Sequence, residues 1–154
     1  MNRNEIKAKI LDFFEVIEGG LQAEDREVKL TRVLDELAMA VHFAEYPFDA
    51  SEFPDAVVRE YGEIREIVSK NFPDLGYYNG ALEIADKIAE SENGVGDAID
   101  DICDIAGDLE EVLWCWENTS VDDALWHFKF SFDSHWGKHL RDLQLYLYAK
   151  AHGW

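Results

Sequence analysis

Four aspartates recur in the middle of the chain at steps of four, three and four residues: Asp97, Asp101, Asp104 and Asp108. On an α-helix these positions fall within an arc of roughly 60°. The arc borders the apolar face of the same segment, so the carboxylates are expected beside a buried seam. Carboxylates in such a row can bind a cation or hold the side chains of a neighbouring helix.

Two histidines near the C-terminus, His135 and His139, are four residues apart and share one helix face. Helical bundles build metal sites from inward carboxylates and histidines on facing helices. One interpretation is therefore a divalent transition-metal site for Zn, Mn, Fe or Ni, although the Glu-x-x-His signature of di-iron bundles is absent from these two segments. Its predicted ligands are Asp101, Asp104, Asp108, His135 and His139.

The simpler interpretation needs no cofactor. Each histidine then donates to an aspartate, and the network fixes the register of two helices. Catalysis without a metal has little support, because neither cysteine is next to a histidine in the sequence and Ser134 lacks a nucleophile-elbow context. We therefore predict no catalytic residue and favour binding over catalysis. The predicted binding residues are Asp101, Asp104, Asp108, Trp136 and Arg141.

Two long helices must position these side chains. Residues 97–118 carry a broad apolar face, and residues 120–152 contain no helix breaker except Gly137. Because the connection between them is short, the two helices should pack antiparallel. The histidine pair would then lie beside the aspartates, and Gly137 would allow a close approach of another helix.

The rest of the chain also favours helices. Apolar residues recur at helical spacing over 5–18, 24–46 and 55–72, and Gly19-Gly20 should end the first of these helices. Residues 73–96 are less clear: 77–88 fit a helix best, with a short strand around 77–82 as the alternative. The predicted fold is an all-α, single-domain bundle of five or six helices over residues 1–154, mostly up-and-down and antiparallel.

The composition excludes several classes of function. The chain has 33 acidic and 14 basic residues, a net charge of −19, which argues against nucleic-acid binding and against docking on anionic lipid. No apolar stretch approaches the roughly 20 residues of a membrane span, and no signal-peptide pattern is visible. We expect a cytoplasmic protein. Cys103 and Cys115 lie about 18 Å apart along one predicted helix, too far for a disulfide, and should be buried thiols.

The uneven charge suggests how the protein acts. Twelve acidic residues and no Lys or Arg lie between Lys87 and Lys129. A compact acidic protein suits a basic protein partner, as inhibitors and immunity proteins do, because opposite charges accelerate association. Alternatively, the acidic composition is an adaptation to a salt-adapted host, and the protein needs no basic partner. The aromatic residues on both sides of the last loop add a further alternative, an exposed patch for a partner or a homodimer.

Two segments also resemble a known family. Residues 97–109 read DAIDDICDIAGDL, and residues 130–139 read FSFDSHWGKH. The pair resembles a bacterial helical domain family of unknown function, with an Asp-rich D-x-x-D-I-x-x-D-L helix followed by an H-W-G-x-H helix. The resemblance covers mainly residues 97–148, and Gly107 departs from it. It implies a small helical domain and no particular activity.

Overall fold

The computed structural model describes residues 1–19 and 25–154. Helices dominate it, and the described chain contains one two-stranded sheet. In chain order the elements are α1 (Arg3–Glu18), α2 (Arg26–Val41), α3 (Tyr61–Asn71), β1 (Tyr77–Ala81), β2 (Asn93–Asp97), α4 (Ala98–Asn118), α5 (Val121–Ser131), the π-helical turn η2 (Phe132–Trp136) and α6 (Gly137–His152). The predicted all-α class is confirmed, with a small β-hairpin added to it.

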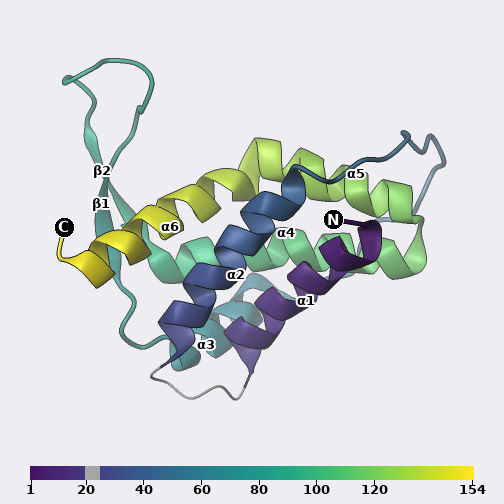
Figure 1. Ribbon diagram of the computed structural model, residues 1–154, viewed down its shortest axis with the longest axis horizontal. Helices are drawn as coiled ribbons and strands as arrows, with labels where there is room; N and C mark the ends of the chain where they lie inside the picture. Colours follow the sequence, from purple (N-terminus) through teal and green to yellow (C-terminus); the bar gives the residue numbers. More distant parts are fainter. Residues whose placement is uncertain (20–24) are drawn as a thin grey trace.

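The helices pack as antiparallel neighbours around one hydrophobic core (Figure 1). α1 packs against α2, while α4 packs against α3, α5 and α6. Each helix contributes apolar residues at helical spacing, as the sequence predicts. The largest fully buried side chains include Phe13, Leu34, Leu37, Ile102, Leu109, Phe128 and Trp136. No helix in the described part of the chain is long and apolar enough to span a membrane.

Local signals bound α1 at both of its ends. α1 begins with a capping box, in which the Asn2 side chain accepts from the Glu5 amide and the Glu5 carboxylate accepts from the Asn2 amide. Gly19 caps its C-terminal end, as expected. Gly20 and the predicted start of the second helix at residue 24 lie outside the described residues.

Residues 42–60, here called the strap, form an extended segment rather than helix ends. The predicted helices 24–46 and 55–72 are therefore too long, since α2 ends at Val41 and α3 starts at Tyr61. Tertiary contacts hold the strap: Ser120 donates to Asp49 at 2.6 Å, and the Arg59 amide donates to Glu110 at 3.0 Å. These tertiary hydrogen bonds outweigh the local helical propensity of the strap residues.

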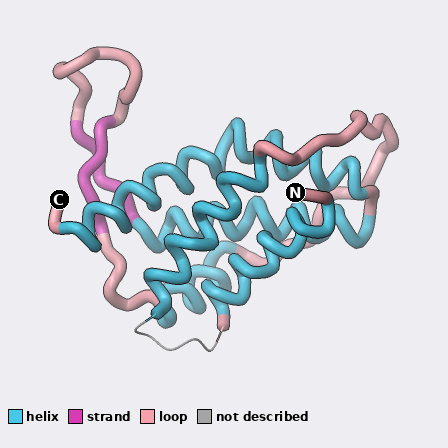
Figure 2. The backbone as a smooth tube through the Cα atoms, in the orientation of Figure 1, coloured by secondary structure: helices cyan, strands magenta, loops and turns pink. Residues whose placement is uncertain are grey.

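The helix preferred for residues 77–88 is wrong, and the alternative of a short strand is correct for β1. β1 and β2 form an antiparallel hairpin, here called the arm (residues 77–97), with Tyr77 opposite Asp97 and Ala81 opposite Asn93. Figure 2 shows the arm extending away from the helices. Exposure alternates along β1, so only every second side chain meets the body of the protein. Five residues are too few for this alternation to stand out in the sequence.

The predicted helix over 120–152 is one continuous rod with a defect that sequence analysis missed. α5 passes through the π turn η2 into α6, and the Gly137 amide donates to the Phe132 carbonyl five residues earlier. A Cβ on Gly137 would lie 2.4 Å from that carbonyl oxygen. Gly137 therefore accommodates its own helix, not the close approach of another helix.

Candidate functional site

α4 meets the π turn η2 and α6, which brings the aspartates and the histidines together, as predicted. His139 lies between two carboxylates of α4: its Nδ1 is 2.8 Å from Asp101 Oδ1, and its Nε2 is 3.3 Å from Asp104 Oδ2. One helical turn earlier, His135 Nδ1 is 2.7 Å from Asp108 Oδ2. The two imidazole rings meet edge to face with centroids 4.9 Å apart. These five residues form a contiguous group, here called the Asp–His cluster.

Three residues of the Asp–His cluster lie close enough together that they could hold a metal ion. One ligand atom from each of Asp104, His135 and His139 lies within 4.8 Å of the other two. The Nδ1 atoms of His135 and His139 face Asp108 and Asp101, while Nε2 of His139 faces Asp104. Metal-binding histidines normally donate their second ring nitrogen to a carboxylate, which orients the ring and raises its basicity.

Burial and charge shape the protonation of the cluster. The hydrogen bond that His139 donates to Asp101 raises the pKa of His139 above its usual range, although burial opposes the shift. Burial also raises the pKa values of Asp104 and Asp108, while the nearby histidines lower them in part. Asp101 is only 4% exposed, so its position is firmly set by its partners.

One supporting residue was not found by sequence analysis. The Tyr78 hydroxyl, on β1, donates to Asp101 Oδ2, and the Tyr78 ring stacks on Tyr146 of α6 with centroids 5.1 Å apart. Burial, then the bond to Asp101, raises the pKa of the Tyr78 phenol, so it stays a donor. No sequence motif links Tyr78 to the aspartates, because only the hairpin brings them together.

Asp97 has a different role from the other three aspartates of the repeat. It caps α4, where its carboxylate accepts from the amides of Ile99 and Asp100. It also pairs with Arg65 of α3 at 2.7 Å. The repeat therefore continues into the helix cap, but the Asp–His cluster starts at Asp101.

The side chains of the other two predicted binding residues have partners other than the Asp–His cluster, although a backbone hydrogen bond from Trp136 opposes the rise in the pKa of Asp108. Trp136 is fully buried in the core, where its Nε1 donates to Ser131 at 3.1 Å. Arg141 is exposed, bonds to Gln144 and lies over the Phe132 ring. The structure therefore gives Trp136 a packing environment and leaves Arg141 on the surface of α6.

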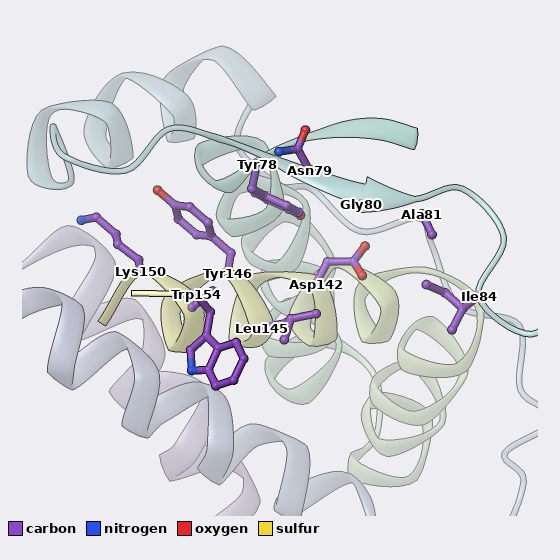
Figure 3. A pocket seen from close by; sticks show the side chains of 11 residues that line it. Tyr78, Asn79, Gly80, Ala81, Ile84, Asp142, Leu145, Tyr146, Lys150 and Trp154 are labelled. Carbon is purple, nitrogen blue, oxygen red and sulfur yellow. The ribbon is translucent and has the colours of Figure 1, made fainter. Parts of the chain in front are cut away.

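A cavity of about 420 Å³ lies where the arm meets the end of α6. Figure 3 shows Tyr78 and Tyr146 on one side of it and Trp154 near the C-terminus on another. Asp142 and Lys150 provide its charged side chains. Tyr78 lines this cavity and donates to Asp101, so it connects the cavity to the Asp–His cluster.

Both cysteines are free and buried, as predicted. Burial raises the pKa of Cys103 and of Cys115 to about 12, so both thiols stay protonated at neutral pH. Neither cysteine therefore provides a thiolate nucleophile unless another group removes its proton. Cys115 nevertheless lies beside His127 across the α4–α5 turn, a proximity that the sequence analysis did not detect.

These observations define the class of the protein. It is an all-α bundle with a short β-hairpin arm and an internal Asp–His cluster. The chain belongs to the family described as a domain of unknown function, DUF5063, which matches residues 5–151. The predicted membership of a helical family of unknown function is thereby confirmed, over more of the chain than the two motifs cover.

A solved structure has the same fold. The crystal structure of protein BF1032 from Bacteroides fragilis superimposes with a TM-score of 0.69 at 15% sequence identity. The match covers 96% of this chain and 87% of that chain. At this identity the likeness shows the fold alone. No curated protein matches the chain.

Proposed function

We propose that the protein binds a divalent transition-metal ion at Asp104, His135 and His139. The observation that carries this proposal is the pairing of both Nδ1 atoms with carboxylates, at 2.7 Å for His135 and 2.8 Å for His139. Nε2 of His139 lies 3.3 Å from a third carboxylate, that of Asp104, and a ligand atom of His135 lies within 4.8 Å of both residues. Two imidazoles and a carboxylate suit Zn, Mn, Fe or Ni.

Exposure of the set supports binding from solution. The side chains of His139 and Asp104 are each about a quarter exposed, and His135 is about half exposed. An ion can therefore enter without opening the core, and water can complete its coordination. Asp101 and Asp108 serve as the carboxylates that orient the two imidazoles.

Metal binding here would strengthen the contact between α4 and α6. Asp104 belongs to α4, while His135 and His139 belong to the final rod, so one ion bridges the two. Asp101 extends the connection to Tyr78 at the base of the arm. A ligand that binds only the folded chain stabilises it, by about 2.7 kcal/mol at a free concentration 100 times its dissociation constant.

The test uses the full chain, without a polyhistidine tag and stripped of metal. We expect isothermal titration with Zn²⁺ or Mn²⁺ to show binding, and thermal unfolding to shift upward in the same solution. His139→Gln should remove one equivalent of bound metal, together with the part of the upward shift that this equivalent produces. His152→Gln is the matched control, because His152 lies in the same helix and contacts Tyr148 instead of the cluster.

Two results would count against this function. One is the absence of binding to a folded wild-type chain; the other is an equal loss in the His139→Gln and His152→Gln variants. In either case the Asp–His cluster would be a network that only fixes the register of the helices.

A second candidate function is binding of a basic protein through the arm. Ile84, Ile88 and Val95 are 72%, 77% and 77% exposed, an unusual density of apolar surface on so small a hairpin. Residues 82–92 also carry four acidic side chains and one basic one, Lys87, which pairs with Glu83. A basic partner with apolar contacts complements this surface better than a second acidic copy in a homodimer.

The Asp–His cluster itself is poorly placed for such a partner, because Asp101 is buried and the histidines occupy the aspartates. The test compares proteins captured by the wild type with those captured by an Ile84→Ser, Ile88→Ser double variant. We expect the wild type to capture a basic protein. Added salt should weaken this binding, and the double variant should not capture the protein. Val57→Ser, an equally exposed site on the strap, is the control. Identical capture by the double variant would contradict a role for the arm.

A further inference from the structure

A second group of metal-ligating side chains lies at the opposite end of α4, where the chain turns into α5. One ligand atom from each of Cys115, Asp123 and His127 lies within 4.8 Å of the other two. The short Thr119–Ser120 turn places the last turn of α4 against the first two turns of α5, where Asp123 and His127 share a face. We call this group the Cys–His cluster.

Neighbouring side chains orient the two polar members of the cluster. Thr119 donates to Asp123 Oδ2 at 2.7 Å, which leaves Oδ1 directed to His127 Nε2 at 3.8 Å. Glu111 Oε1 lies 3.3 Å from His127 Nδ1. The free carboxylate oxygen and the free ring nitrogen therefore face the same space, and each is held by a partner on its far side.

The cluster lines a cavity of about 330 Å³ that the strap covers. The strap contributes Ser51, Phe53, Pro54, Asp55, Ala56 and Val58 to the lining. Hydrogen bonds hold it down at both ends, through Asp49 and through Arg59. Three carboxylates, of Asp55, Glu111 and Asp123, line the cavity, and its lining includes no Lys or Arg.

We propose that Cys115, Asp123 and His127 form a second metal site, specific for a thiophilic divalent ion such as Zn²⁺. A thiolate, an imidazole and a carboxylate are the ligands that Zn²⁺ takes in proteins, and three protein ligands leave one position open toward the cavity. Binding would release the thiol proton of Cys115 to solvent while the sulfur–metal bond forms. The carboxylates around the cavity attract the cation and oppose the entry of anions.

The sulfur ligand gives this site a signal that the Asp–His cluster cannot produce. Cobalt(II) bound to a thiolate shows a sulfur-to-metal charge-transfer absorption in the near ultraviolet, and cobalt bound only to oxygen and nitrogen does not. The test titrates cobalt(II) into the reduced, metal-free full chain. We expect this absorption to saturate by the second equivalent, because the Asp–His cluster also takes up cobalt, and to disappear when Zn²⁺, which binds more tightly, is added.

Variants locate the signal. Cys115→Ser should abolish it, while Cys103→Ser, which removes the other buried thiol of α4, should keep it. His139→Gln should also keep it and lose only the cobalt bound at the Asp–His cluster. Glu111→Gln leaves all three ligands in place, and we expect it to weaken cobalt binding about 10- to 100-fold.

Several outcomes would overturn this second site. A folded wild-type chain that binds cobalt without the charge-transfer absorption would exclude it and leave the Asp–His proposal intact. Loss of the absorption in Cys103→Ser but not in Cys115→Ser would assign it to the wrong thiol. Unchanged cobalt binding in Glu111→Gln would show that Glu111 does not orient His127 as a ligand. This result could be read even if the Cys115 variant failed to fold.

Discussion

At the scale of single residues, the molecule uses similar aspartates for different tasks. Asp101 is buried between Tyr78 and His139, whereas Asp97 begins a helix and pairs with Arg65. Burial by itself raises the pKa of Asp97, but Arg65 and the capped amides lower it overall. A carboxyl whose pKa falls on folding stabilises the folded state above its unfolded pKa, near 3.8, and loses that contribution as the pH falls through the folded value.

Asp97→Asn tests this assignment, because Asn keeps the helix cap and removes the charge. We expect the variant to be less stable at pH 7 by about 0.5–1 kcal/mol, the range for a solvent-screened ion pair. The deficit should shrink below pH 4, where the wild-type carboxylate takes up its proton. Urea unfolding at several pH values measures it. A deficit that stays constant down to pH 2 would show that the charge of Asp97 contributes nothing.

At the scale of elements, the arm depends on a close contact that only glycine allows. A Cβ on Gly96 would lie 2.1 Å from the Tyr78 ring, which Tyr146 and Asp101 hold in place. We expect Gly96→Ala to destabilise the protein by about 1–3 kcal/mol through overpacking. It should also weaken metal binding at the Asp–His cluster, because Tyr78 would move away from Asp101.

Gly80→Ala is the matched control in the same hairpin, since nothing lies within 4 Å of the added Cβ. Thermal unfolding and zinc titration of both variants measure the two effects. Equal stability of the two variants would show that Tyr78 can move aside without cost. The arm would then be independent of the cluster that it contacts.

At the scale of the whole molecule, helical periodicity carried most of what could be predicted. The periods of α1, α4 and the C-terminal rod, together with one short turn, were enough to place Asp101, Asp104 and Asp108 beside His135 and His139. The pairing of β1 with β2, the full length of the strap and the π turn were not predicted, although a strand near residue 77 was an alternative. Each depends on contacts between residues distant in sequence or on a single inserted residue. Neither of these causes produces a periodic spacing of apolar residues in the sequence.

The same limit explains the missed partners of the two clusters. Tyr78 reaches Asp101 through the hairpin, and His127 reaches Cys115 through the α4–α5 turn, so sequence spacing does not reveal either pair. Charge counting did better for composition than for location. The count of twelve acidic residues between Lys87 and Lys129 does not show that two of them, Asp101 and Asp104, face His139 within the fold.

The π turn has a consequence for the two clusters on the C-terminal rod. An inserted residue rotates everything downstream of it about the helix axis relative to everything upstream. His127 precedes Phe132–Trp136 and His139 follows it, so this turn sets the angular phase between the two imidazoles. Shortening the rod by one residue there would swing His139 away from α4 and leave His127 beside Cys115. Chain length at a single turn, with every ligand retained, therefore decides whether the molecule has both clusters or only one.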